Sequence, residues 1–369
     1  MKALIVGGTG PTGPCIVDGL LSRGYAVTIL HRGTHEIEFS GPVEHLHGDP
    51  HFVETLEKTL GSRTFDLAIS NYGRLRLVAE VMKGRTPRFI GITGSGHFLV
   101  LTDPRGPVGI PIPLPEDSPV CLDPSLNKFQ YLVAISEQEI MKIHDEGHYN
   151  ATILRYPVIY GPRQLVPAAW CIIKRILDGR KQLILPDGGF SLQTEGYAEN
   201  MAHAVLLAVD KPEESRGQIY FVRDDKMITL RERIEIISQV MHHEWEFINM
   251  PGELALPSYP YSGVQRWRYH RVTDISKIKS ELGYRDLFPV EEAIGRTVNW
   301  YLQNPPEPAG QEVQNLRDPF DYEVEDRFIT EFREFSDRIM STAFAKPGQG
   351  GHPYPHPKEP GQLRDEMGR

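Results

Sequence analysis

The sequence predicts an α/β protein built on a Rossmann-type, doubly wound parallel sheet, with a smaller C-terminal α/β substrate lobe and a C-terminal helical extension. Three observations predict this fold. A short apolar run at residues 3–6 precedes three glycines at G-x-x-G-x-x-G spacing, Gly7, Gly10 and Gly13, and a helical pattern follows them. Strand-like apolar runs then alternate with helical patterns as far as residue 160. With 369 residues the chain can also bury a large core or two ordinary ones.

Composition and charge narrow the classes of function. The chain is 40% hydrophobic and 24% charged, as is typical of globular proteins. Its net charge of -9 argues against a general nucleic-acid or membrane-surface binder, so we expect neither partner. Three separated cysteines (Cys15, Cys121 and Cys171) form no C-x-x-C pair and indicate free thiols in a reducing compartment. Because neither a signal peptide nor an apolar run of transmembrane length is apparent, we expect a cytoplasmic location.

The glycine turn predicts a binding site for the pyrophosphate of a dinucleotide. Glycines let the backbone approach the anion, and the free N–H groups and dipole of the following helix face it. We expect cofactor contacts from Gly7, Gly10, Pro11, Thr12 and Gly13. The alternative is an ordinary strand–helix turn, which the strand before the glycines and the helix after them disfavour.

The end of the second predicted strand, residues 25–30, favours NADP over NAD. NAD-binding folds usually place an Asp or Glu about 20 residues after the glycines, where it accepts a hydrogen bond from the ribose 2′-hydroxyl. Here the position reads His31-Arg32, and a cation suits the additional 2′-phosphate of NADP. The alternative is that Arg32 is only a solvated turn residue.

Strand ends further along the chain supply more candidates. The next predicted elements are a strand at residues 43–46, a helix at 52–60, a strand at 65–70, a helix at 75–82 and a strand at 88–93. Ligands of doubly wound sheets bind at the carboxyl ends of strands. We therefore expect cofactor contacts from Asp49, Asn71 and Tyr72, although Asp49 could instead cap the following helix.

The second half of the chain predicts a substrate lobe. After a proline-rich loop, helices are predicted at residues 126–144, 167–177, 197–210, 274–282, 290–302 and 322–340. A further helix is predicted to begin after Thr229, its N-cap. Strands are predicted at residues 151–154, 183–185, 219–222 and 247–250. We divide the chain into a mainly NADP-binding domain (1–165), a mainly substrate-binding lobe (166–305), a helical extension (306–345) and a disordered tail (346–369). Some later segments return to the first domain. We expect no metal, because no H-x-x-x-H or carboxylate cluster is visible.

Taken together, these features resemble the extended short-chain dehydrogenase/reductase superfamily, which contains sugar-nucleotide epimerases and dehydratases. The resemblance covers roughly residues 1–305 and rests on the glycine turn, Gly48-Asp49, Thr93-Gly94-Ser95, Glu116-Asp117-Ser118-Pro119, Tyr131, Leu154-Arg155-Tyr156-Pro157, Tyr160-Gly161-Pro162 and the strand around residues 216–222. It implies a nicotinamide cofactor with Tyr131 and Tyr156 beside it, a small-molecule substrate and a homodimer.

The catalytic signature of that family is incomplete in this sequence. The family uses Tyr-x-x-x-Lys on one helix, with a Ser or Thr at the end of the fifth strand. Tyr131 matches the tyrosine, and Ser95 and Thr93 are candidates for the hydroxyl partner, but Ile135 occupies the lysine position. A lysine cation lowers the tyrosine pKa, whereas an aliphatic neighbour adds no charge. Lys128 could share the face of Tyr131, although a surface lysine in the first turn is the more ordinary interpretation.

The leading interpretation is therefore an NADP(H)-binding oxidoreductase that acts on a small or aromatic carbonyl or alcohol. Tyr131, with Ser95 or Thr93, would handle the proton. Val158 stands where nucleotide-sugar enzymes of the family usually carry asparagine, which disfavours a UDP- or GDP-sugar. Two alternatives stay open: an epimerase or lyase that uses the bound cofactor without net redox change, and a cofactor-binding regulatory or RNA-binding protein, for which the basic and aromatic residues 266–271 are a weak indication.

Overall fold

The structure is a computed structural model that describes residues 1–34, 36–71, 73–94, 111–262, 270–342 and 356–364. The chain divides into two compact units, Met1–Phe320 and Asp321–Arg369. The second unit contains α12 (Tyr322–Met340), whose N-cap, Asp321, accepts a hydrogen bond from the Val324 N–H. This confirms the helix predicted at residues 322–340. Among the described residues, no helix combines the length and apolar character that crossing a membrane requires.

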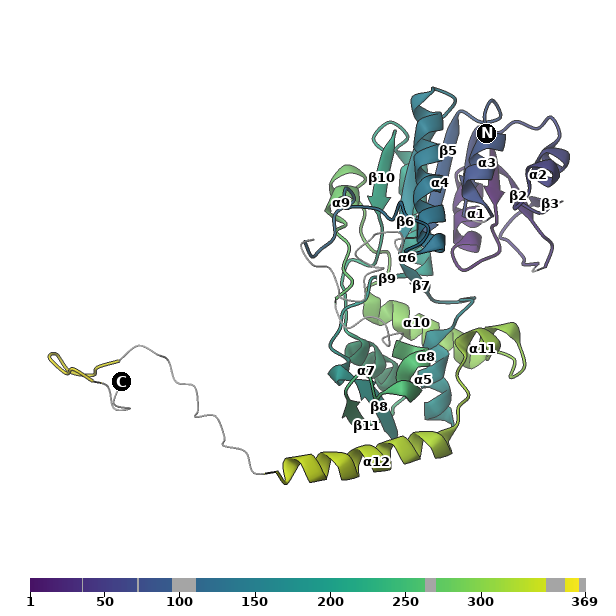
Figure 1. Ribbon diagram of the computed structural model, residues 1–369. Helices are drawn as coiled ribbons and strands as arrows, with labels where there is room; N and C mark the ends of the chain where they lie inside the picture. Colours follow the sequence, from purple (N-terminus) through teal and green to yellow (C-terminus); the bar gives the residue numbers. More distant parts are fainter. Residues whose placement is uncertain (35, 72, 95–110, 263–269, 343–355, 365–369) are drawn as a thin grey trace. The chain divides into compact units, whose positions relative to one another are not determined.

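A seven-stranded parallel sheet is the centre of the first unit (Figure 1). In spatial order its strands are β10 (Gln218–Phe221), β6 (Asn150–Tyr156), β5 (Arg88–Gly94), β4 (Leu67–Ser70), β1 (Lys2–Val6), β2 (Ala26–His31) and β3 (Val43–His47). The chain runs outward from β1 through β2 to β3 and then returns to β4 on the other side of β1. The strand order therefore reverses between β1 and β4, which is where ligands of such sheets bind.

Helices cover both faces of this sheet. One apolar cluster joins the sheet to α1 (Gly13–Ser22) and α6 (Ala198–Asp210), with α9 (Ser276–Glu281) at its margin. The other joins the opposite face to α2 (Val53–Leu60), α3 (Leu75–Val81) and α4 (Lys128–Asp145). The predicted doubly wound α/β fold is confirmed.

Two elements from the second half of the sequence belong to the sheet. β10 pairs with β6, and α6 packs so closely on α1 that a Cβ on Gly19 would lie 2.3 Å from the Leu206 side chain. Helix α6 begins one residue later than predicted, because Tyr197 is still the last residue of the short strand β9 (Glu195–Tyr197). Sequence order alone therefore does not separate the sheet from the substrate lobe.

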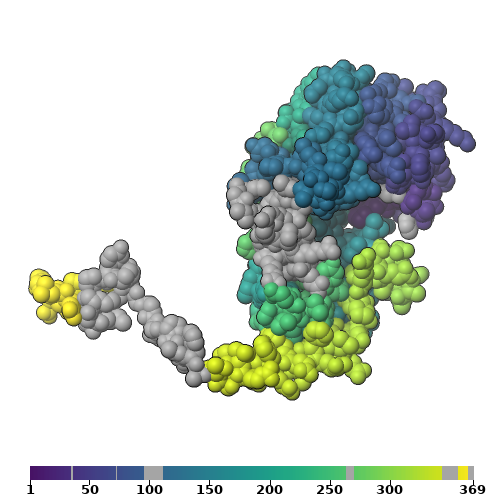
Figure 2. All heavy atoms as spheres, in the orientation of Figure 1, coloured from purple at the N-terminus to yellow at the C-terminus, as the bar shows by residue number. Residues whose placement is uncertain are grey.

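The C-terminal lobe, predicted to bind the substrate and called the substrate lobe below, has its own core. Its elements are α5 (Ala168–Leu177), β8 (Gln182–Pro186), α7 (Leu230–Val240), β11 (Glu246–Met250), α8 (Tyr259–Ser262), α10 (Val290–Gln303) and α11 (Gln311–Leu316). Thr229 caps α7 in a reciprocal capping box with Glu232, as predicted. β7 (Val158–Tyr160) pairs with β9 between this lobe and the sheet. Figure 2 shows the purple and blue atoms of the sheet half above the green atoms of the lobe within the first unit.

Candidate cofactor and catalytic site

The glycine turn joins β1 to α1 at the carboxyl edge of the sheet. Gly7 and Gly8 have φ angles of 108° and 99°, in the region that favours glycine. A Cβ on Gly13 would lie 2.2 Å from the Gly8 carbonyl oxygen, so only glycine lets α1 begin this close to the turn. A Cβ on Gly10, in contrast, would meet no atom within 4 Å. The turn is therefore closed on its inner side and open at Gly10, as a backbone cradle for an anion requires.

Thr12 and Tyr156 connect the turn to the core. Thr12 is the N-cap residue of α1, and both Thr12 and Tyr156 are buried. The Tyr156 hydroxyl donates to the Met201 carbonyl oxygen at 3.0 Å. Burial raises the pKa of Tyr156 far above its ordinary value, so the phenol stays neutral. Tyr156 thus supports the turn from the core, and a contact between Tyr156 and the cofactor stays a prediction.

Asn71 follows β4 at the same edge of the sheet. Its backbone N–H donates to the Val6 carbonyl oxygen, which fixes it beside the glycine turn. Its side-chain oxygen is buried and has no hydrogen-bond partner in the described part of the chain. Because a buried acceptor without a donor is costly, a hydroxyl or amide donor from a bound cofactor fits this position. Tyr72, also predicted to contact the cofactor, lies outside the described residues.

The Asp49 carboxylate contacts His51, two residues later in the same turn. It accepts from the backbone N–H of His51 at 3.0 Å and faces the His51 ring nitrogen Nδ1 at 2.6 Å. These hydrogen bonds hold the pKa of Asp49 below its ordinary value, with a smaller contribution from the Arg32 cation. Phe52, and not Asp49, is the N-cap residue of α2. The alternative that Asp49 caps the helix is therefore wrong.

The end of β2 carries His31 and Arg32. His31 is buried, and burial lowers its pKa. Arg32 is exposed directly after the strand and lies close enough to Asp49 to influence its carboxylate. Arg32 therefore places a positive charge at this edge of the sheet, and its contact with a 2′-phosphate stays a prediction.

A buried ionic network lies beneath the expected reaction site. Thr93, near the end of β5, donates from its hydroxyl to Glu137 Oε1 at 2.7 Å. Arg155 of β6 donates to the same carboxylate, with Nη2 2.7 Å from Oε2, and its Nη1 donates to the Glu116 carbonyl oxygen at 2.7 Å. Sequence analysis missed Glu137 and Arg155. The sequence could have indicated this pair, because Glu137 on α4 and Arg155 on β6 are opposite charges among buried residues that are largely apolar.

Tyr131 lies in the first turns of α4. The helix begins at Lys128, two residues later than predicted, because Asn127 caps it by accepting from the Gln130 N–H at 3.1 Å. Tyr131 and Ile135 are both partly buried, one turn apart, whereas Lys128 is exposed. Ser95 lies outside the described residues, so its predicted proximity to Tyr131 stays a prediction.

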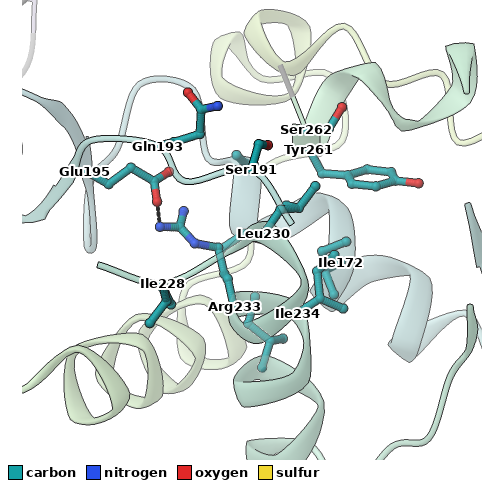
Figure 3. Close-up of a pocket in the computed structure, with 13 residues that line it drawn as sticks. Ile172, Ser191, Gln193, Glu195, Ile228, Leu230, Arg233, Ile234, Tyr261 and Ser262 are labelled. Atoms are coloured by element: carbon teal, nitrogen blue, oxygen red, sulfur yellow. Dashed lines mark ion pairs between the residues drawn. The ribbon is translucent and has the colours of Figure 1, made fainter. Parts of the chain in front are cut away.

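The substrate lobe contains a cavity of about 50 Å³ (Figure 3). Ile172 and Ile234 contribute apolar surface to one part of it, while Gln193 and the ion pair between Glu195 and Arg233 lie on another side. The Gln193 amide nitrogen is buried and has no acceptor among the residues that the structure describes. The cavity therefore has an apolar wall and an ion pair at its border.

Comparison with known proteins agrees with this fold. Residues 106–222 match the NAD dependent epimerase/dehydratase family. The chain is 28% identical over 212 residues to UDP-D-apiose/UDP-D-xylose synthase 2 of Arabidopsis thaliana, covering 51% of this chain and 53% of that protein. It is 26% identical over 325 residues to a putative UDP-glucose 4-epimerase of Methanocaldococcus jannaschii, covering 82% of this chain and 98% of that protein. The chain spans about half the length of the first curated relatives it matches.

Solved structures extend the likeness to most of the chain. A UDP-glucose 4-epimerase of Thermotoga maritima with UDP-glucose superposes with a TM-score of 0.65 at 18% identity, covering 82% of this chain and 99% of that one. A dTDP-glucose 4,6-dehydratase of Bacillus anthracis in complex with NAD gives 0.63 at 16% identity, covering 83% and 97%. These findings support a nicotinamide cofactor but do not distinguish NADP from NAD. Residues 106–222 thus match the NAD dependent epimerase/dehydratase family, and the fold of most of the chain is similar to that of solved epimerases and dehydratases.

Proposed function

We propose that the chain is an oxidoreductase that binds NADP(H) in preference to NAD(H) and acts on a small or aromatic carbonyl or alcohol. The observation that carries the proposal is the contrast between Gly13, which the Gly8 carbonyl closes, and Gly10, which is open. Such a turn at a helix N-terminus binds a pyrophosphate through its backbone. Arg32, exposed at the end of β2, supports the preference for NADP.

Separate residues of the chain would bind the cofactor and transfer the proton. When bound, the nicotinamide supplies or accepts a hydride at C4. The N-terminus of α1 holds the pyrophosphate, and Asn71 accepts a hydrogen bond from the cofactor. Tyr131 exchanges the proton with the substrate oxygen. Ile135 places no cation beside Tyr131, whereas the family carries a lysine at this position.

The cavity of the substrate lobe supports a small ligand. Its volume of about 50 Å³ admits only a few heavy atoms, and Tyr131 is not among its lining residues, so it would take only part of a substrate. Ile172 and Ile234 offer apolar contact there. Val158, which is 55% exposed, provides no hydrogen bond where the nucleotide-sugar enzymes of the family usually have asparagine. A carbonyl compound with an apolar body matches these features better than a nucleotide sugar does.

Two other functions are alternatives to this proposal. The names of the matched family and relatives, which are epimerases, dehydratases and sugar-nucleotide synthases, favour an epimerase or lyase without net redox change. An RNA-binding or regulatory role rests on residues 266–271, most of which lie outside the described residues. Nucleic acid that remains bound during purification and is released by moderate salt would favour this last function.

The test is to mix the purified chain with NADPH and a panel of small and aromatic aldehydes and ketones, following the near-ultraviolet absorbance of NADPH. We expect oxidation with at least one member of the panel, and Tyr131→Phe should lower its rate about 100-fold. The matched control is Tyr25→Phe, because Tyr25 precedes β2 at the opposite edge of the sheet. Tight NADPH binding without oxidation of any member would contradict the reductase function. A substrate isomerised without net oxidation of NADPH would establish the epimerase or lyase instead.

A further inference from the structure

Three histidines and a glutamate meet at the outer edge of the sheet, away from Tyr131. His31 ends β2, His45 and His47 lie on β3, and Glu36 lies on the segment that joins these strands. β2 and β3 are parallel and place His31 directly opposite His47. His45 is two residues before His47 and therefore points to the same face of the sheet. The register of two strands thus brings three imidazole rings together.

The ligand atoms of the four side chains already have the spacing of a metal coordination shell. His31 Nε2 lies 3.2 Å from His45 Nδ1, and Glu36 lies 2.9 Å from His45 Nδ1 and 3.0 Å from His47 Nε2. His31 Nε2 and Glu36 Oε1 are 3.9 Å apart, and all four ligand atoms lie within 4.8 Å of one another. In a tetrahedral zinc site with bonds of about 2.0 Å, neighbouring ligand atoms lie about 3.3 Å apart. Only small side-chain movements separate the cluster from that geometry.

Packing restrains the cluster on one side and leaves it accessible on the other. The His31 ring is 5% exposed, and the rings of His45 and His47 lie edge-on to it at 5.2 and 5.0 Å. Phe39 packs against His45. The side chains of His47 and Glu36 are 59% and 52% exposed, which provides a route for an ion. One weak contact opposes ligation: the Gly33 N–H donates to His31 Nδ1 at 3.3 Å, and this hydrogen bond must break when Nδ1 carries the proton and Nε2 binds a metal.

We propose that His31, Glu36, His45 and His47 bind a divalent transition-metal ion, with zinc as the best match. Three imidazole nitrogens and one carboxylate oxygen are ligands that Zn²⁺ accepts in tetrahedral geometry, whereas Mg²⁺ and Ca²⁺ prefer oxygen alone. The bound ion would link the segment that contains Glu36 to both β2 and β3. It would also fix the backbone next to Arg32, so the metal site and the proposed 2′-phosphate site share one edge of the sheet.

The test is calorimetric titration of Zn²⁺ into the untagged, chelator-treated full chain, with the bound metal counted by elemental analysis. We expect a high-affinity phase of one Zn²⁺ per chain and no such phase with Mg²⁺. His47→Ala is the principal variant, because its exposed ring can be removed without opening the core. It should weaken this phase about 100-fold or more, since even the outer partners of metal ligands are worth about 10- to 100-fold. His45→Ala should have a similar effect.

The matched control is His148→Ala. His148 is also exposed and lies 3.6 Å from a glutamate, Glu146, but in the described structure it is not part of the histidine cluster. This variant should bind Zn²⁺ as the unaltered chain does. Replacing Zn²⁺ with Co²⁺ should give the strong visible absorption of four-coordinate cobalt, and His47→Ala should lose it. Absence of stoichiometric binding, or binding and a cobalt spectrum unchanged in both His47→Ala and His45→Ala, would overturn the proposal.

Discussion

The glycine turn and the surroundings of Tyr131 lie at the same edge of the sheet but differ in what makes them specific. At the turn, the decisive contact is between backbone atoms: a Cβ on Gly13 would lie 2.2 Å from the Gly8 carbonyl oxygen. At Tyr131, function depends on the charge of one neighbouring side chain, and Ile135 has none. The turn therefore has the backbone geometry that an anion cradle requires, whereas Ile135 leaves the surroundings of Tyr131 without the lysine of the family that the sequence resembles.

The largest expected effect on cofactor binding comes from disrupting the turn itself. Gly13→Ala forces the backbone of Gly8 and α1 apart and should weaken NADPH binding about 100-fold or more, because a displacement of about 1 Å is enough for such a loss. Isothermal calorimetry measures the affinity. Gly10→Ala is the control, since its methyl group meets no protein atom within 4 Å. It should leave the free energy of unfolding within about 0.5 kcal/mol of the original and still weaken NADPH binding. Unchanged NADPH affinity in both variants would show that the cofactor does not lie over this turn.

The next effect concerns the network beneath Tyr131. Glu137→Ala leaves the Arg155 guanidinium, which is 4% exposed, without its carboxylate partner and should lower the free energy of unfolding by about 3–5 kcal/mol. Urea unfolding measures this loss. Glu139→Ala, two residues later on α4, removes an ion pair with the exposed Lys142 and a side-chain hydrogen bond with Glu80, and should cost about 1 kcal/mol or less. Equal costs for the two variants would mean that the buried network does not stabilise the fold.

Placing a lysine at position 135 tests whether the missing cation beside Tyr131 matters for proton transfer. In Ile135→Lys, a lysine one helical turn from Tyr131 places a cation beside the phenol and should speed alcohol oxidation about tenfold at neutral pH. The pH profile of kcat should move to lower pH, and Tyr131→Phe combined with Ile135→Lys should cancel the shift. A profile that does not move would contradict the account of Tyr131 as the proton donor.

The smallest expected effect concerns the choice of cofactor. Arg32→Ala removes a charge-assisted contact with the 2′-phosphate and should weaken NADPH binding about tenfold while leaving NADH binding unchanged. Parallel titrations of the two cofactors measure the ratio. Arg338→Ala, in the second unit, controls for the loss of one positive charge from the chain. Equal loss of NADPH and NADH affinity would place Arg32 outside the phosphate site.

Features set by the local backbone were predictable from the sequence. The glycine turn and the capping box at Thr229 depend on residues close together in the chain, so spacing alone indicates them. The start of α4 differs because Asp123 accepts a hydrogen bond from the Ser125 N–H at 2.8 Å and closes a turn of its own, leaving Asn127 as the cap. Two competing polar caps within a few residues cannot be ranked by propensity alone.

Features set by contacts between distant residues were not predictable in this way. Thr93 is a candidate for catalysis in the sequence, but its hydroxyl donates to Glu137, 44 residues later. His45 and His47 do not have the helical H-x-x-x-H spacing of a metal motif, but two histidines two residues apart on a strand share a face. Their meeting with His31 depends on the register between β2 and β3, which a single sequence does not contain.

The central claim is that the open turn at Gly10 holds a nicotinamide dinucleotide. Calorimetric titration of NADPH into the purified chain, beside the same titration of Gly10→Ala, tests it most directly. We predict one saturable site per chain, tighter for NADPH than for NADH, with the affinity for NADPH lowered in Gly10→Ala while its thermal unfolding is unchanged. Absence of saturable binding of either cofactor, or equal affinity in the two proteins, would contradict the claim.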